Sequence, residues 1–448
     1  MCLVVCAIYG QWLFGISSQS QFFRIKLDGD DKSISSSYDP FNVDNPQIWA
    51  VPQEQILTYT GESDVILDTD EPGKLVSDGR YIVWAAKDGA VYYDLKFPNR
   101  GVQLLSTPVP SDPTDLDDIP KDWVDCDWID GYFILASRNG QFFHSLLYQT
   151  QFDQLEFART EANPDGLVGV QTLNRRVFLF GTNSVEQWFN AGRRDFAFAR
   201  DNSSILNVGA ASKAAIAKNE THIIFLGNNG VVYATSGGAA QPISTDSVAY
   251  DIGRSLLPKA RAYTYTEENH RFYVLTLEFL NGSKKTWAFD LTTQLWHERT
   301  QTDILCIANL DIGPGINQRR SLVGKENSEH IYDQRLDWGQ EDTDNAVIPI
   351  ERECVSPVVY ANLQRVNNYV FDIDIPKRDG DAQDELFFET EDSGRKSIPR
   401  QRKLDYGPRH RFSRLGQFYY GRRFRIQTNA KRRVDILSAH IEIDVAVD

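Results

Sequence analysis

The stretch RVFLFGTNSVEQWFNAG, residues 176–192, contains two β-rich runs joined by a short polar turn, and it decides the fold. β-Branched and aromatic residues on both sides of the turn predict an antiparallel hairpin. Glu186 lies in the second run, where a hairpin of this type normally has an aromatic residue. If it is buried, we expect it to form an ion pair with Arg175, Arg176, Arg193 or Arg194; the alternative is that it faces a functional contact. The ion pair is favoured, because a buried carboxylate without a partner is costly.

Related hairpins recur along the chain. Copies begin at Ser77, Ile129, Leu173, Lys218, Glu268 and, in weaker form, Asn317, at intervals of 52, 44, 45, 50 and 49 residues. Four copies have a turn that tolerates the positive φ angles of tight hairpins: Asp88-Gly89, Asn139-Gly140, Asn229-Gly230 and Asn281-Gly282. The residues that match Glu186 in other copies are Tyr92, Phe143, Tyr233 and Tyr332.

A hairpin-bearing repeat of about 40–50 residues predicts a β-propeller, in which blades bury their faces against one another. We therefore predict an all-β chain with a propeller-like domain of six or seven blades over residues 1–345. The alternative is a series of β-sandwiches with coincidental spacing. Helical periodicity is nearly absent, and the best helical candidate, residues 207–219, is equally consistent with a strand and a turn.

The apolar N-terminal segment MCLVVCAIYGQWLFGI has its first cation only at Arg24 and is interrupted by Gln11 and two glycines. We expect a buried strand pair rather than a signal or a membrane anchor. The pair resembles the closing hairpin of a blade, so either the chain begins in mid-blade or its last strands complete the first blade. Five scattered cysteines without a CxxC pair predict reduced thiols and an intracellular folding compartment.

A domain boundary is expected around residues 340–355, so that residues 346–448 form a smaller C-terminal β-domain. Several β-rich runs follow this boundary, and we expect them to form a sandwich. The alternation in HIEIDVAV, residues 440–447, predicts a half-buried antiparallel strand.

Charge is distributed unevenly. The chain has 47 basic and 62 acidic residues and a net charge of −15, yet residues 395–433 contain fourteen Lys or Arg and one acid, Asp405. That segment carries +13 and the remaining residues −28, which indicates a partner. We expect a partner-binding basic patch that contacts an acidic protein surface rather than DNA phosphates: Arg409, Arg411, Arg414, Arg422, Arg423 and Arg425. The alternative is a solvated strand face.

Catalytic and metal-binding patterns are missing. The seven histidines are scattered, and neither nucleotide-binding glycine motifs nor a hydrolase elbow is found, so we expect no catalytic site, no metal and no cofactor. Eight aspartates occur between Asp112 and Asp130. Calcium is one interpretation, but the EF-hand spacing is missing, and a solvated acidic loop between blades is favoured.

Residues 157–212 closely resemble the packaged-DNA stabilisation proteins of short-tailed bacteriophages, also called tail hub or nozzle proteins. The resemblance rests on an acid-x-x-Pro-Asp run ending at Asp165, a strand that ends in Phe-Gly, a Thr turn, Val-Glu followed by an aromatic residue, and a Phe-x-Phe segment. The residues that carry it are Asp165, Gly181, Thr182, Glu186, Trp188, Gly192, Phe196 and Phe198. Residues 241–252 and 409–428 resemble further segments of the family.

The resemblance implies a structural, non-enzymatic protein of the virion tail, folded and assembled in the host cytoplasm. It implies a ring of subunits, usually six, below the portal and the head-to-tail adaptor. In such a ring, the functional alternative for Glu186 is that it faces a subunit contact or the channel. That ring would form the lower DNA channel, retain packaged DNA with a needle or plug, and lie near tailspikes or fibres. Genomic DNA would pass without sequence-specific binding, and an acidic lining would favour sliding.

Two other functions remain open from the residues alone. A carbohydrate-active propeller enzyme, a glycosidase or a lyase, would use the abundant Tyr and Trp for sugar stacking, although the Asp-boxes of sialidases are missing. A propeller scaffold of the cytoplasm is the third, weaker reading.

Overall fold

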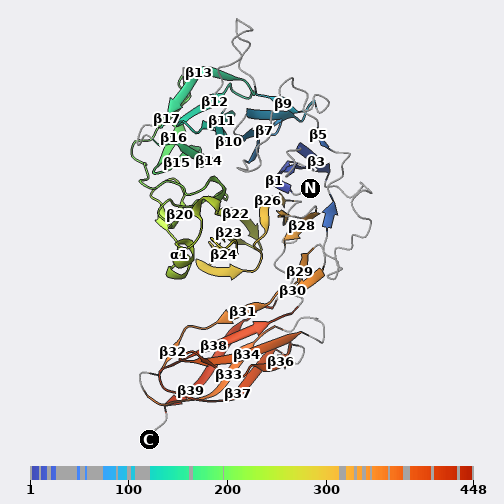
Figure 1. Ribbon diagram of the computed structural model, residues 1–448, viewed down its shortest axis with the longest axis vertical. Coiled ribbons are helices and arrows are strands. Elements are labelled where there is room, and N and C mark those ends of the chain that lie inside the picture. Colours follow the sequence, from blue (N-terminus) through green and yellow to red (C-terminus); the bar gives the residue numbers. More distant parts are fainter. Residues whose placement is uncertain are drawn as a thin grey trace. The chain divides into compact units, whose positions relative to one another are not determined.

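The computed structural model (Figure 1) describes residues 3–9, 12–17, 22–26, 48–50, 56–57, 74–86, 89–97, 102–105, 122–160, 165–194, 196–311, 319–326, 330–334, 340–343, 346–361, 364–376, 384–404, 408–430 and 434–445. The chain divides into two compact units, Met1–Gln334 and Arg335–Asp448. Among the described residues, no helix has both the length and the apolar character needed to cross a membrane.

The first unit is a β-propeller, and the structure describes seven four-stranded antiparallel blades in it. The strands of each blade are named from the innermost outward. Blade 1 has β1 (Leu3–Tyr9), β2 (Trp12–Ser17), β3 (Phe22–Lys26) and β5 (Ile56–Leu57), and blade 2 has β6 (Leu75–Ser77), β7 (Tyr81–Ala86), β8 (Gly89–Asp94) and β9 (Val102–Leu104). Blade 3 has β10 (Trp123–Ile129), β11 (Tyr132–Ser137), β12 (Gln141–Ser145) and β13 (Phe152–Arg159), and blade 4 has β14 (Leu167–Leu173), β15 (Arg176–Gly181), β16 (Val185–Asn190) and β17 (Phe198–Arg200).

The remaining blades continue the same order. Blade 5 has β18 (Ile216–Lys218), β19 (Ile223–Leu226), β20 (Val232–Thr235) and β21 (Gln241–Pro242); blade 6 has β22 (Arg261–Glu267), β23 (His270–Glu278), β24 (Lys284–Asp290) and β25 (Leu295–Arg299); blade 7 has β26 (Ile304–Asp311), β27 (Arg319–Lys325), β28 (His330–Gln334) and β4 (Ile48–Ala50). Neighbouring innermost strands lie against one another, and β1 contacts both β26 and β6, which closes the ring.

The ring closes in a way that the sequence did not predict. The N-terminal segment supplies the three inner strands of blade 1, and its outer strand, β5, follows later in the chain. Between them, β4 crosses to blade 7 and pairs with β28, Tyr332 opposite Ile48. Both predicted closures were therefore wrong, because the early segment completes the last blade. The predicted strand pair is present as β1 and β2, and Leu13 and Phe14 are fully buried.

Each blade is built around the hairpin that the repeat predicted. The turn glycines Gly140, Gly230 and Gly282 have φ angles of 87°, 78° and 79°, as the Asn-Gly pairs required. The strand register confirms the match of Glu186 with four aromatic residues: Glu186 pairs with Leu179, and the aromatic residues pair with Val83, Leu135, Phe225 and Val323 in the same way. The two remaining blades place Phe23 and Trp287 there, opposite Gly15 and Leu275. Six of seven blades thus have an aromatic residue at this position.

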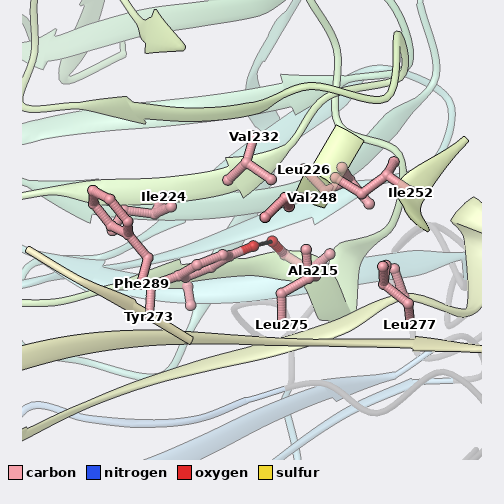
Figure 2. Close-up of a cluster of buried hydrophobic side chains, with 12 residues drawn as sticks. Ala215, Ile224, Leu226, Val232, Val248, Ile252, Tyr273, Leu275, Leu277 and Phe289 are labelled. Carbon is pink, nitrogen blue, oxygen red and sulfur yellow. Dashed lines mark hydrogen bonds between the residues drawn. The ribbon is translucent and has the colours of Figure 1, made fainter. Parts of the chain in front are cut away.

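Apolar clusters fill the space between neighbouring blades. Figure 2 shows the cluster between blades 5 and 6, where the Tyr273 hydroxyl donates a 3.2 Å hydrogen bond to the Ala215 carbonyl. The short helix α1 (Asp246–Ile252) adds Val248 and Ile252 to this cluster. The predicted helical candidate, residues 207–219, contains a single 3-10 turn, η3 (Lys213–Ala215), and then β18. It is therefore a turn and a strand.

The second unit is a two-sheet β-domain. One sheet contains β31 (Arg352–Val355), β32 (Val359–Tyr360), β38 (Gly421–Thr428), β34 (Glu385–Asp392), β35 (Arg395–Lys396) and β36 (Arg400–Lys403). The other contains β37 (Arg409–Phe418), β33 (Val366–Asp374) and β39 (Ser438–Val445). Phe371 of β33 packs on Phe388 and Phe424 of the opposite sheet, so the two sheets share one core. The predicted boundary after residue 345 falls inside a hairpin of β29 (Gln340–Thr343) and β30 (Ala346–Pro349).

β39 differs from its prediction. The alternation of HIEIDV is real, because Ile441 pairs with the core residue Phe371 and shares its face of the sheet. Yet Ile441, Ile443 and Val445 are 36%, 45% and 47% exposed. β39 is an edge strand that pairs only with β33 among the described strands, and the face that should be half-buried is open.

Candidate functional site

Asp165 shapes the turn of the blade 4 hairpin. Its carboxylate accepts hydrogen bonds from the backbone N–H of Asn183 (2.9 Å), from the Asn183 amide (3.0 Å) and from the Ser184 hydroxyl (3.1 Å). Gly181 lies against it, because a Cβ at that residue would be 3.0 Å from the Asp165 Cβ. The four motif residues before Asp165 lie outside the described residues. The described part of the motif therefore has a clear structural role.

Thr182 links this turn to blade 5. Its carbonyl accepts a 2.8 Å hydrogen bond from the side chain of Asn228. Gly209 packs so closely that a Cβ there would lie 2.1 Å from the carbonyl carbon of Thr182. Sequence reasoning missed Gly209, since nothing local distinguishes it from other loop glycines. Any side chain at this position would push blades 4 and 5 apart.

Glu186 is buried, with 1% of its surface exposed, and it is paired. Its Oε2 accepts a 3.1 Å hydrogen bond from the indole N–H of Trp188, and its Oε1 lies 3.9 Å from Arg200 Nη1. The predicted buried ion pair is present, but the partner is Arg200, which was not among the four predicted arginines. Two of those candidates pair elsewhere, Arg175 with Asp130 and Arg176 with Asp201, while Arg193 and Arg194 are exposed.

Trp188, Phe196 and Phe198 belong to the core between blades 3 and 4. Trp188 packs on Phe142 with ring centroids 4.9 Å apart, and Phe196 packs on His144 at 4.8 Å. Gly192 follows β16 with a φ of 62° and an open surrounding, so it serves the loop conformation rather than packing. The family-motif residues are thus brought together around one hairpin, and their described contacts are structural.

The strongest cluster of charges lies where the innermost strands meet, and sequence reasoning missed it. Asp125 and Asp127 of β10 are 3% and 4% exposed, whereas the sequence predicted a solvated acidic loop. The ammonium groups of Lys74 and Lys218 each lie 2.9 Å from Asp127 Oδ2, and Lys74 lies 3.7 Å from Asp125. The prediction was wrong for these two residues, because the alternation WVDCDWI marks an inner strand. Asp112–Lys121 lie outside the described residues.

Backbone groups of blade 4 complete this hub network, which we define as Lys74, Asp125, Asp127, Thr172 and Lys218. Asp127 accepts a 2.7 Å hydrogen bond from the Thr172 N–H, and Lys218 donates to the Thr172 carbonyl at 3.1 Å. Burial alone would raise the pKa of Asp127, but the ammonium groups of Lys218 and Lys74 outweigh it and hold that pKa well below its usual value. The network therefore joins blades 2, 3, 4 and 5 with charges that neutralise one another.

The predicted basic patch is only partly free. Arg409 and Arg411 form bidentate pairs with Asp374 and Asp372 on the neighbouring strand. Arg425 is near three carboxylates, those of Glu353, Glu389 and Glu391.

Arg422 departs most clearly from the predicted basic patch. Its side chain is 3% exposed, holds Asp392 through two hydrogen bonds of 2.7 and 2.6 Å, and donates to the Leu415 carbonyl at 2.7 Å. Such a guanidinium is a structural group and not a docking group. Arg414 and Arg423 are exposed, as the patch requires.

The described residues include no group of three or more His, Cys, Asp or Glu side chains arranged to hold a metal ion. Asp125 and Asp127, two neighbouring buried aspartates, are held by lysines. The chemistry of the candidate sites is therefore that of ion pairing and packing.

Comparison with known protein families identifies the family of this chain. The family model described as "Bacteriophage P22 Gp10, beta-propeller", a phage stabilisation family, matches residues 56–301. This chain belongs to that family. The match begins at β5 and ends just after β25, so it contains blades 2 to 6 and all of the predicted motif residues. The C-terminal unit lies outside the match, and its resemblance to the family remains an interpretation.

The chain was also compared with curated proteins and with solved structures. None of the curated proteins matches the chain. Among solved structures, the chain is similar to the computationally designed Ika8 protein, with 11% identity, a TM-score of 0.41, and coverage of 74% of this chain and 96% of that chain. It is also similar to the WD40 β-propeller domain of Doa1, with 10% identity, a TM-score of 0.38, and coverage of 74% and 92%.

Proposed function

We propose that this phage stabilisation protein is a tail hub subunit. Copies would form a ring, with six as the expected number, below the portal and the head-to-tail adaptor. The ring would form the lower DNA channel and, with a needle or plug, retain packaged DNA until ejection. Tailspikes or fibres would attach nearby, and the subunit itself would catalyse no reaction.

The observation that carries the proposal is the family match over five consecutive blades. The site geometry supports it, because the described motif residues other than Gly192 stabilise a blade hairpin or the contact between two blades. A rigid structural ring needs this kind of contact. The charged hub network supports the same reading, since its carboxylates are used for internal ion pairs.

The chain is also suited to lie beside DNA that must pass without binding. Its net charge is −15, and DNA carries negative charge, so the surface as a whole does not attract phosphates. The carboxylates of β10 do not supply the acidic lining that we expected, because Lys74 and Lys218 neutralise them. Repulsion would have to come from exposed acids elsewhere.

The test is DNA retention by phage particles assembled without this chain. We expect heads that fill and then leak DNA, and that hold it when purified protein is added back. A variant with a disrupted blade contact, Gly209→Leu, serves as the inactive add-back control. Particles that keep their DNA and infect normally without the chain would refute the proposal. Hydrolysis or cleavage of glycans by the purified protein would then favour the carbohydrate-active alternative.

A further inference from the structure

The C-terminal unit has two edges of opposite character. The sheet orders place β36 and β37 on one side of the sandwich and β39, β31 and β32 on the other. Figure 1 shows the same arrangement within this unit, with β36 and β37 on one side and β32 and β39 on the other. Each side has edge strands whose outer backbone groups need protection.

The first side is covered by cations, and we call it the basic edge: Arg400, Arg402, Lys403, Arg409, Arg411 and Arg414. Arg400 of β36 bridges the two sheets, donating hydrogen bonds to the carbonyls of Ser413 and Arg414 in β37, the latter at 2.9 Å. Arg402 lies over the Phe412 ring, 5.8 Å from its centroid. All six side chains are exposed. Arg402, Lys403 and Arg414 have no carboxylate within salt-bridge distance among the described residues.

The second side is uncovered, and we call it the open edge: Ile441, Glu442, Ile443, Asp444 and Val445 of β39. Its three apolar side chains are 36%, 45% and 47% exposed. Its two carboxylates lie on the opposite face of the strand and are exposed, without a cation within salt-bridge distance in the described chain. Tyr360 of β32, on the same side of the sandwich, is 74% exposed. A long exposed apolar edge strand is normally protected, so this one indicates a binding surface.

We infer that the open edge of one copy binds the basic edge of the next copy. The charges are complementary, because Glu442 and Asp444 would meet Arg402, Lys403 and Arg414, and among the described residues none of these five side chains has an oppositely charged partner within salt-bridge distance. The long alkyl stems of Arg and Lys would also cover the isoleucines, since such side chains bury their stems while the charge stays at the rim. The two surfaces are different and lie on opposite sides of the unit. The contact is therefore heterologous, and such contacts repeat head to tail, into a ring when the rotation between copies closes and into a filament when it does not.

This inference rests on the proposed function in one respect, because it supplies the contact that a tail ring requires. Its test uses purified full-length protein and no phage particles, so the two can fail separately. Glu442→Lys with Asp444→Lys makes both edges positive. Lys403→Glu with Arg414→Glu replaces two of the unpaired cations of the basic edge by carboxylates, which would repel the carboxylates of the open edge. We expect wild-type protein to associate as its concentration rises in sedimentation velocity, and each double variant to remain monomeric.

The decisive experiment is a one-to-one mixture of the two double variants. The two lysines of each altered open edge then meet the two glutamates of an altered basic edge, and each unchanged open edge meets an unchanged basic edge, so assembly should return. Glu220→Lys with Asp246→Lys is the control, since it changes the net charge equally at exposed sites of the propeller. We expect it to associate like wild type.

Several outcomes would overturn the inference. They are a wild-type protein that stays monomeric at every concentration, double variants that associate normally, and a folded mixture that does not associate. If only the Lys403/Arg414 variant assembled normally, the basic edge would be assigned to a different partner. DNA retention by particles without the chain would refute the proposed function and leave this result intact.

Discussion

The two units of this chain place their charges in different ways. In the propeller, the two pairs of the candidate site lie in the protein interior: Asp127 is 4% exposed beside two lysines, and Glu186 is 1% exposed beside Arg200. In the C-terminal unit, two pairs lie on the surface of a sheet, where the Arg409 and Arg411 side chains are 58% and 60% exposed. Arg422 and Arg425 differ from them, because their side chains are 3% and 18% exposed.

This difference separates charges that maintain the fold from charges that are available to partners. A buried ion must be desolvated, so removing its partner leaves an uncompensated charge that costs several kcal/mol. An exposed pair remains hydrated, and its net contribution is small. The comparison therefore assigns the interior pairs to stability and leaves the surface cations for assembly.

The largest effect is expected from Asp127→Ala. The change leaves Lys74 and Lys218 partly buried without their shared carboxylate, and it also removes the acceptor for the Thr172 N–H. We expect a loss of about 3–5 kcal/mol in the free energy of unfolding. Chemical denaturation followed by tryptophan fluorescence measures it, because eight of the nine tryptophans precede residue 335. A loss below about 1 kcal/mol, as for an exposed pair, would show that the hub network does not stabilise the fold.

The same carboxylate has a definite pH dependence. The pKa of Asp127 is lower in the folded state than its ordinary value of 3.8, so the unfolded state binds the proton more readily. Its stabilising contribution is complete above that ordinary value and is lost as the pH falls toward the folded pKa. Glu220→Gln, an exposed residue near Arg271, is the control and should leave the acid transition unchanged.

The second-largest loss of stability is expected at Arg422, and its neighbour Arg423 should show almost none. Arg422→Ala should cost about 2–4 kcal/mol, because it removes a buried guanidinium with charged hydrogen bonds to Asp392 and leaves the Leu415 carbonyl without its donor. Arg423→Ala, one residue away and exposed, should change stability by less than about 0.5 kcal/mol. Far-UV circular dichroism of both variants during denaturation decides this. Equal losses would contradict the assignment of Arg422 to the fold.

The sequence predicted the propeller because each blade repeats a local signal, a hairpin with a tight turn. The match of Glu186 with four aromatic residues was visible for the same reason, whereas Phe23 and Trp287 were found at this position only in the structure. The partners of buried charges were not visible: Lys74 and Lys218 lie 53 and 91 residues from Asp127, and Arg200 lies on the next strand of the blade. The closure of the ring by β4 was not predicted either, since a three-residue strand has no recognisable sequence pattern. In β39, alternation gave the direction of the side chains but not whether another surface covers them.

An intermediate effect is expected from Glu186→Gln. The amide oxygen can still accept the hydrogen bond from the Trp188 indole, but the charge beside Arg200 is lost. We expect a loss of about 1–2 kcal/mol, because a hydrogen bond to a neutral acceptor contributes less than a hydrogen bond to a charged group, which contributes about 1.5–3 kcal/mol. Glu186→Ala should cost more, because the buried indole N–H then has no acceptor. Thermal unfolding of the two variants measures the order, and an unchanged melting temperature for Glu186→Gln would show that its charge does not contribute.

The smallest effect is expected at the exposed pair of Arg411 and Asp372, even though its geometry is better than that of Glu186. Its two hydrogen bonds are 2.9 and 2.8 Å long, and they hold the pKa of Asp372 below its usual value. Because the Arg411 side chain is 60% exposed, water and salt screen the pair, and Arg411→Ala should cost less than about 1 kcal/mol. Denaturation at low and at high salt checks this, with the difference from wild type shrinking as salt rises. A loss as large as that of Arg422→Ala would mean that surface pairs also maintain this sheet, and the separation between structural and available charges would fail.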